Sequence, residues 1–496
     1  MNHLALRCLA LTAAAVTTAV LATACGNDAS GTPGAQTLGD RLFPELGNGG
    51  YDTELYEVSY DYRPESPTMD STVRMTARAT QDLSEFSLDS AGQRLESVRV
   101  DGTDAQFRTE REKLIITPKS SVPEGDSFTV DITFVADRSA NPLSPALNLP
   151  PDLPPEAQAI LAENTPWVAA PDGFALLGQP DRAHVFFPSN DHPRDKAIVS
   201  FRVSTPADVQ AVANGTRQSS TTDNGRTTVV YRTAQPIPTH VVQVAVGRLT
   251  EIDATANSGL PLRSYVPTAQ TDALRPVVAR TAEQLAWLET TLGRPFPFEQ
   301  YGVLGVDSSY RDSALETATL STFGATALAG PEDVEAPTMM HELVHQYFGD
   351  AVALWSWDDM WLSEGHAMYY QNRYAADRGF LDFEQRMLAL YQSAAAARPD
   401  DGPPTRLSTA GGVLSDTDAP GAVTLYALRN TVGEDTFHRI EQTFLDRFLQ
   451  KSASTADYVK VASEVAGRDL GSFFDEWLSG PNLPPMPGHP DWKPAE

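Results

Sequence analysis

The feature that most constrains this chain is a change in the spacing of its apolar residues near Ile252. From Tyr51 to about Gly247, short segments such as STVRMTARA and SFTVDITFV alternate apolar and polar residues and are rich in β-branched side chains. This is the pattern of strands with one buried face. Beyond Ile252, segments such as RPVVARTAEQLAWLETTLG and FHRIEQTFLDRFLQK repeat apolar residues at helical spacing. The pattern predicts an α+β multidomain protein, with an all-β domain followed by a mainly helical domain.

The domain boundaries follow from the same pattern. We expect the all-β domain over residues 51–251 and the mainly helical domain over 252–480, and the Pro-rich tail, 481–496, is predicted to be loop. Residues 25–50 are rich in Gly, Ser, Thr and Asp and predict a flexible tether. At 496 residues the chain is long enough for such a set of domains.

Residues 1–24 have the layout of a secretory signal peptide, because Arg7 precedes an apolar run that is short for a membrane span. The run ends LATAC, which resembles the lipobox of bacterial lipoproteins and implies a lipid on Cys25. The alternative is a plain secretory signal cleaved after Ala24. Cys8 and Cys25 are the only cysteines, so removing the signal leaves a single thiol. In both cases we expect an extracytoplasmic protein, either a cell-envelope lipoprotein or a secreted one.

The charge of the chain excludes one class of partner. Its formal net charge of -28 repels polyanions such as nucleic acids and anionic lipid headgroups. We therefore expect no nucleic-acid partner, and contact with a membrane only through the lipid on Cys25. Neutral and cationic peptides remain compatible with this charge.

The stretch MHELVHQYFGD carries a predicted metal-binding pattern. His341 and His345 are four residues apart, so on a helix they face the same way, with Glu342 beside them. A second predicted helix, within DDMWLSEGHAMYYQN, offers Glu364 nineteen residues past His345. Two imidazoles, one carboxylate and an open fourth position make the ligand set of a catalytic zinc site. We expect one Zn²⁺ per chain on His341, His345 and Glu364.

Taken together, HELVHQYFGD and WLSEGHA resemble the signature of the gluzincin aminopeptidases, the family of aminopeptidase N and leukotriene hydrolase. GQPDRAHVFFPSNDHPRDKA, VQVAVGRL, SALET and FFDEWL extend the resemblance over most of the chain after the tether. The resemblance implies an N-terminal β-saddle domain before a thermolysin-like catalytic domain. It also implies that metal-activated water hydrolyses N-terminal residues from peptides with a free N-terminus, with Glu342 as general base.

The same resemblance implies which residues hold the substrate. Glu316, within DSALET, occupies the position that binds the free ammonium group, where a charge-assisted hydrogen bond would fix the chain end. Gln179 stands where many relatives have a second glutamate, and its amide can still accept a hydrogen bond. Asp359 and Gln371 are expected to support the metal ligands. Gln371, seven residues past Glu364 and on the same helix face, replaces a frequent acid, which could lower metal affinity.

One position departs seriously from the family. DTDAPGAVTLYALR retains Gly421 and the helix pattern that follows, but Asp418 stands where relatives have a tyrosine that stabilises the oxyanion. Loss of one such donor typically costs about a hundred- to a thousand-fold in turnover, and an ionised aspartate would also repel the developing charge. Tyr426 or Tyr310 are the alternatives that could replace the missing hydroxyl.

Our leading hypothesis is a zinc-dependent aminopeptidase. The alternative is a degenerate family member that binds zinc and peptide N-termini with little turnover, as a peptide-binding surface lipoprotein. Epoxide hydrolysis is a third hypothesis, suggested only by the similarity of EGHA to the leukotriene hydrolase branch.

Overall fold

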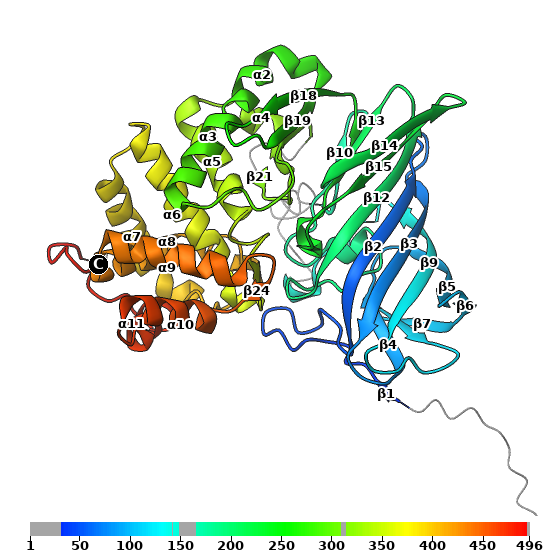
Figure 1. Cartoon of the computed structure of the whole chain (residues 1–496), viewed down its shortest axis with the longest axis horizontal. Helices are drawn as coiled ribbons and strands as arrows, with labels where there is room; N and C mark the ends of the chain where they lie inside the picture. Colours follow the sequence, from blue (N-terminus) through cyan, green and yellow to red (C-terminus); the bar gives the residue numbers. More distant parts are fainter. Residues whose placement is uncertain (1–30, 141, 148–164, 309–313, 494–496) are drawn as a thin grey trace, which may run out of the picture.

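The computed structural model describes residues 31–140, 142–147, 165–308 and 314–493. It consists of a β domain and a domain of helices, in that order along the chain, which lie side by side (Figure 1). One apolar cluster runs through both halves, from strands of the first domain to helices of the second. The predicted fold class is therefore confirmed. The predicted signal peptide, Cys25 and Tyr310 lie outside the described residues.

The β domain is built around one long sheet, drawn in blue to green in Figure 1. Within the described residues this sheet has nine strands in the order β14-β15-β12-β2-β3-β9-β5-β6, with β16 beside β12. Buried and exposed residues alternate along β2 and β3, as expected when one face packs on the core and the other faces solvent. The strands are β2 (Tyr51–Asp61), β3 (Thr68–Ala79), β5 (Arg94–Val100), β6 (Thr103–Asp104), β9 (Ser127–Asp137), β12 (Lys196–Pro206), β14 (Thr216–Asp223), β15 (Arg226–Arg232) and β16 (Ile237–Pro238).

Two smaller sheets complete this domain. One has the order β1-β4-β8-β7, with β1 (Thr32–Pro33), β4 (Leu83–Asp89), β7 (Gln106–Glu110) and β8 (Lys113–Thr117). The other has the order β10-β11-β17-β13, with β10 (Trp167–Ala170), β11 (Gly173–Leu176), β13 (Gln210–Ala213) and β17 (Val244–Gly247). Apolar side chains of this second sheet pack against strands of the helical domain, so it forms the junction between the domains.

The second domain combines a sheet with helices. The sheet has the order β18-β19-β20-β22-β21, with β18 (Leu249–Thr255), β19 (Pro261–Pro267), β20 (Val303–Val306), β21 (Ala314–Leu315) and β22 (Ser321–Gly324). The helices are α2 (Thr271–Ala279), α3 (Thr281–Leu292), α4 (Ala325–Leu328), α5 (Glu332–His345), α6 (Trp361–Asp377), α7 (Phe383–Asp401), α8 (Asp418–Val432), α9 (Glu434–Phe448), α10 (Thr455–Ala466) and α11 (Gly471–Leu478). A short pair, β23 (Ala353–Leu354) and β24 (Ser452–Ala453), ties α5 to the C-terminal helices. Because β18 belongs to this sheet, the domain begins at about Leu249, slightly before the predicted boundary at 251/252.

Residues 31–49 are not a flexible tether, and that prediction is wrong for this part of 25–50. Leu42, Phe43 and Leu46 are buried, and the Phe43 ring packs edge-on against Trp357 of the second domain at 5.4 Å between centroids. Asp40 accepts a hydrogen bond of 2.9 Å from the backbone N–H of Trp357. The apolar side chains in this segment bury surface between the two domains, which outweighs its loop-like composition.

The C-terminal tail is loop, as its composition indicates, but it is packed on the helices. Trp492 stacks on Tyr426 of α8 at 5.7 Å, and the Tyr391 hydroxyl donates to the Pro484 carbonyl at 2.9 Å. The tail therefore covers one side of α7 and α8 and engages the aromatic ring of Tyr426.

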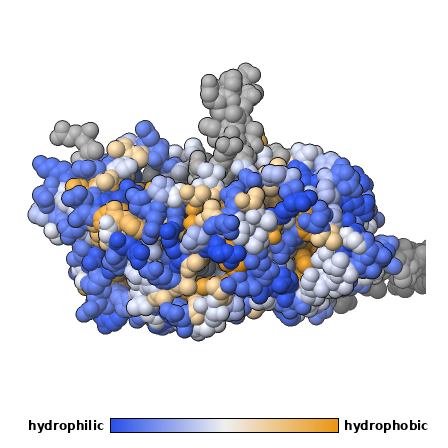
Figure 2. All heavy atoms as spheres, turned by 90° about the horizontal axis from the view of Figure 1, so that it is seen from above, coloured by the Kyte–Doolittle hydropathy of each residue, from blue (hydrophilic) through white to orange (hydrophobic). Residues whose placement is uncertain are grey.

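The outer surface is largely polar on the face seen in Figure 2. Seen from above, the molecule is mostly hydrophilic, and apolar residues show mainly in patches towards the middle of this face and at one end (Figure 2). In the part of the chain that the structure describes, no helix is long and apolar enough to cross a membrane.

Candidate metal centre and substrate cleft

Three predicted ligands converge between α5 and α6. The Nε2 atom of His341 lies 3.3 Å from Glu364 Oε2, and the Nε2 atom of His345 lies 3.5 Å from the same oxygen. The three ligand atoms all lie within 4.8 Å of one another. An α-helix has 3.6 residues per turn, so two histidines four residues apart lie on the same face of α5. Glu364, in the first turn of α6, completes the set of three ligands.

The opposite ring nitrogen of each histidine is engaged by the protein. His341 Nδ1 lies 2.9 Å from the side-chain oxygen of Gln371, and an amide oxygen accepts, so Nδ1 carries the proton. His345 Nδ1 lies 2.8 Å from Ser363 Oγ and 3.3 Å from the Phe348 carbonyl oxygen. These contacts leave the Nε2 atoms of both histidines directed at Glu364 and free to bind a metal ion, which is the arrangement of a metal site with supporting partners. Gln371 thus lies where it can support His341, and the donor set fits zinc.

The electrostatics of the site favour a cation. Burial raises the pKa of Glu342 to about 8. Burial also opposes the charge on Glu364, but positive His345 and hydrogen bonds from both imidazoles lower its pKa to about 2. Burial disfavours the charged imidazole of His345, yet the carboxylates of Glu316 and Glu364 raise its pKa to about 10. A divalent cation would displace these protons, since its ligands must be neutral imidazoles and ionised carboxylates.

The substrate residues predicted from the resemblance meet beside the metal ligands. Gln179, in the loop after β11, donates from Nε2 to Glu316 Oε1 at 2.7 Å, and both side chains are buried. Glu316 directly follows β21, and its backbone carbonyl accepts from Gln346 Nε2 at 3.2 Å. The sequence reasoning missed Gln346, although its place directly after His345 could have pointed to it. The β domain thus contributes Gln179 and the second domain contributes Glu316 to one hydrogen-bonded pair beside the metal ligands.

A close approach of two helices places Asp418. A Cβ atom on Gly365 of α6 would lie only 2.6 Å from the Gly421 Cα atom of α8, so only glycine fits at either position. This contact brings the first turn of α8 against the first turn of α6, and Asp418 faces the ligands there. Burial raises its pKa to about 6, and the nearby Glu364 adds to the increase.

These residues line one cavity of about 570 Å³, which we call the metal cleft. In the described part of the chain its lining consists of Pro166, Leu177, Gln179, Arg182, Ala314, Leu315, Glu316, His341, Glu342, His345, Glu364, Gly411, Leu414, Ser415 and Asp418. Arg182 was not singled out by the sequence. It is held by Glu112 through contacts of 3.0 and 2.9 Å and by Asp181 at 3.1 Å, so its charge is largely neutralised.

Two predictions are corrected here. Asp359 does not support the metal ligands: it accepts hydrogen bonds from Thr455 and from Ser356, both through backbone N–H and hydroxyl groups. It caps a helical turn and joins it to α10, a local role that leaves it no contact with the imidazoles. Tyr426 does not replace the missing hydroxyl, because its OH pairs with His489 Nε2 at 2.7 Å, away from the metal cleft.

The support of His341 by Gln371 can be tested through metal affinity. Replacing Gln371 by leucine removes the acceptor for His341 Nδ1–H, and we expect zinc affinity to fall about tenfold to a hundredfold. Gln371→Glu should raise affinity above that of the native chain, since an ionised acceptor makes the imidazole a stronger ligand. Competition against a fluorescent zinc chelator measures both. Asp359→Asn is the control and should leave zinc affinity unchanged; the same affinity in Gln371→Leu would contradict the assigned role.

Comparison with known proteins agrees with this geometry. The peptidase family M1 domain matches residues 277–405, a range that holds the metal ligands, Glu342 and Glu316. Glutamyl aminopeptidase of Rattus norvegicus is 24% identical over 325 residues, covering 62% of this chain and 34% of that protein. Aminopeptidase 2 of Candida albicans is 26% identical over 321 residues, covering 60% of this chain and 34% of that protein. The chain therefore spans about a third of the length of these relatives.

Solved structures match over nearly the whole chain. An M1 zinc metallopeptidase from Deinococcus radiodurans has a TM-score of 0.77 and 28% sequence identity, covering 93% of this chain and all of that chain. A mutant of that protein bound to a Tyr-Ser-Ala substrate has a TM-score of 0.76 at 28% identity, covering 92% of this chain. The ligand set, the domain order and these similarities together support the resemblance of this chain to the gluzincin aminopeptidases, with the peptidase family M1 domain matched over residues 277–405.

Proposed function

We propose that this protein is a zinc-dependent aminopeptidase that removes N-terminal residues from peptides. The observation that carries the proposal is the Glu316–Gln179 pair beside His345 and Glu342. A buried carboxylate next to a metal site provides an anchor for an ammonium group. Binding of that ammonium group by the pair would fix the substrate at its first residue, which an endopeptidase does not require.

In the proposed reaction, metal binding, substrate binding and proton transfer are carried out by different residues of the cleft. Zinc on His341, His345 and Glu364 supplies Lewis-acid activation of water and of the scissile carbonyl. Glu316 and Gln179 bind the substrate ammonium and so hold the first peptide bond at the ligands. Glu342 takes a proton from the attacking water, keeps it on its buried carboxyl group and donates it to the leaving amine. Its pKa, raised by burial, suits both the acceptance and the return of that proton.

The general-base role is tested by Glu342→Gln. This change removes the proton acceptor but keeps the shape of the side chain, so we expect zinc to remain bound while kcat falls by at least roughly a hundredfold. Release of an aminoacyl fluorophore measures kcat, and metal analysis measures zinc. The matched control is Glu332→Gln, an exposed acid on the same helix, which should retain full activity. Removal of zinc by a chelator should abolish release; release that persists in Glu342→Gln or without zinc contradicts the proposal.

The binding alternative also has support in the structure. Asp418 lines the metal cleft where the family resemblance leads us to expect a tyrosine, and among the described residues no tyrosine lines that cleft. An acid at this point opposes charge on the oxyanion and so slows turnover. The second candidate function is therefore a zinc-binding family member that holds peptide N-termini with little hydrolysis.

Two substitutions separate these functions. Asp418→Tyr restores a hydroxyl donor, and we expect kcat to rise about a hundredfold over the native chain. Asp418→Phe removes the acid without adding a donor, so it should recover only part of that gain. Steady-state kinetics on aminoacyl substrates measures both. Equal rates in the two variants would show that the hydroxyl is not what the site lacks, and a fall in Asp418→Tyr would contradict the position assigned to Asp418.

We further propose that the protein acts outside the cytoplasm, as a lipoprotein anchored through Cys25 or as a secreted protein released after Ala24. The layout of residues 1–25 supports this proposal. Mass spectrometry of the mature N-terminus from the natural cell is the test: a diacylated Cys25 is expected for the anchored form. An unprocessed Met1 would contradict both forms.

A further inference from the structure

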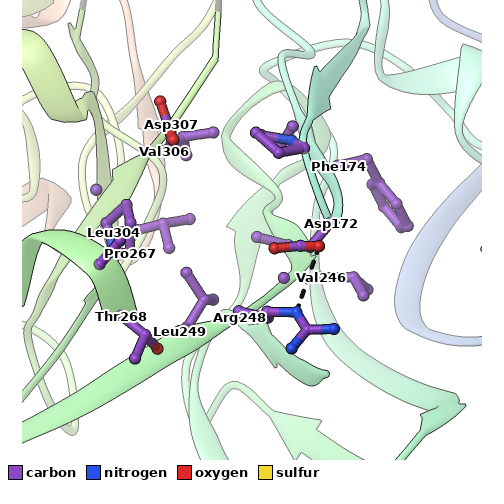
Figure 3. A pocket seen from close by; sticks show the side chains of 16 residues that line it. Asp172, Phe174, Val246, Arg248, Leu249, Pro267, Thr268, Leu304, Val306 and Asp307 are labelled. Carbon is purple, nitrogen blue, oxygen red and sulfur yellow. Dashed lines mark ion pairs between the residues drawn. The ribbon is translucent and has the colours of Figure 1, made fainter. Parts of the chain in front are cut away.

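A second cavity, separate from the metal cleft, lies where the β domain meets the sheet of the catalytic domain. Its volume is about 340 Å³, and it shares no lining residue with the metal cleft. Its walls come from the ends of β10, β11 and β17 on one side and of β18, β19 and β20 on the other (Figure 3). Cavities of this size at domain junctions commonly bind small ligands. We call it the junction pocket.

The sequence explains why the junction is hollow here. Ala245 of β17 packs in the apolar layer between the domains, together with Leu304 and Val306 of β20. Gly247 is two residues along the same strand and so presents the same face. A methyl group and a missing side chain at these two positions leave the layer unfilled. A Cβ atom at Gly247 would meet only the Leu249 side chain, at 3.8 Å, so the space in front of it is open.

The charged groups at this pocket are mostly acidic. Arg248 is the guanidinium at the pocket, and it is shared by Asp172 at 3.3 Å and by Asp208 at 3.1 Å. Asp307, at the other end of the pocket in Figure 3, is exposed and has no hydrogen bond or ion pair with any described residue. Two carboxylates, Asp172 and Asp307, therefore line the pocket with one cation, and Asp208 outside the cavity shares that cation. The local charge is negative, which favours a positively charged ligand.

We propose that the junction pocket is a second binding site, for a small molecule with an aliphatic body and one ammonium group. The apolar side chains of Leu304, Val306 and Leu249 would cover the body of the ligand. Asp307 would accept hydrogen bonds from the ammonium group, which it can do without breaking any contact to the described residues. A carboxylate ligand is disfavoured, because Arg248 is already engaged by two acids.

Hexylamine is a suitable probe, and isothermal titration of the zinc-loaded protein is the measurement. We expect two binding events, because the ammonium group also fits Glu316 in the metal cleft. Glu316→Gln should remove one event and leave the junction-pocket event. Gly247→Leu fills the junction pocket and should weaken the other event by at least about tenfold, with an unchanged melting temperature. If Glu316→Gln keeps both binding events while Gly247→Leu weakens one, the result counts against the proposed aminopeptidase site. If Gly247→Leu leaves hexylamine binding unchanged while Glu316→Gln removes one event, the junction pocket is not a binding site.

Charge variants provide the second test, on exposed side chains that do not enter the core. Asp307→Asn should weaken the junction-pocket event roughly tenfold, the loss of one charge-assisted contact. Asp208→Asn removes the same charge at a residue that pairs with Arg248 but does not line the pocket, and should change the affinity by less than about twofold. Hexanoate, which has the same chain and the opposite charge, should not bind. Tighter binding of hexanoate than of hexylamine, or equal effects of the two asparagine variants, would overturn the assignment.

Discussion

The burial of carboxylates at one point is the constraint on which the rest of this structure depends. Glu316, Glu342 and Glu364 expose only 4%, 5% and 7% of their surface, and taking an ionised carboxylate out of water costs several kcal/mol unless it is compensated. Glu364 is compensated by the two imidazoles and Glu316 by the amide of Gln179. One oxygen of Glu342 has no hydrogen-bond partner within the described part of the chain. Such an acid is stable at neutral pH only as a proton carrier or beside a cation, and this is what a metal-dependent hydrolase requires of it.

Contacts within and between the two domains hold the carboxylates of the metal cleft in place. The glycine contact between α6 and α8 lets two helices approach so closely that Glu364 and Asp418 face one cavity. The loop that carries Gln179 is fastened within the β domain by the pair His184–Asp191 at 2.7 Å. Burial opposes the charge on His184, but Asp191 and Glu112 raise its pKa to about 9, so this fastening is an ion pair at neutral pH. The site is therefore as rigid as the two domains are relative to each other, and Phe43 against Trp357 contributes to that rigidity.

Local periodicity was enough to pair His341 with His345, because their relative directions follow from helix geometry alone, whereas Glu364 lies on a second helix and required the spacing of the family signature. The contact of Gln179 with Glu316 joins residues 137 positions apart, and no local pattern specifies it; only the family resemblance did. Asp359 was misassigned although a local signal was present, since Ser356 and Asp359 form a capping box. Residues 31–49 were predicted to be a flexible tether because their overall composition is polar and rich in glycine. The burial of Leu42, Phe43 and Leu46 holds this segment against the protein instead. Tertiary packing thus decided the structure of residues 31–49, whereas the error at Asp359 came from a local capping signal that was given no weight.

In the proposed mechanism, Asp418 is expected to affect the chemical step more than the binding of substrate. With zinc present, the carboxylates of Glu316, Glu342, Glu364 and Asp418 outnumber the positive charges of the metal, so a substrate with a free ammonium group is attracted to the cleft. That attraction acts on the ground state and the transition state alike, and uniform binding of this kind does not accelerate the chemical step. The negative charge that develops on the substrate carbonyl, by contrast, meets an acid where it needs a donor. Under the proposed mechanism, Asp418 at the start of α8 is therefore expected to lower turnover without weakening substrate binding, because the contacts of His341, His345, Glu364, Glu342 and Glu316 do not depend on it.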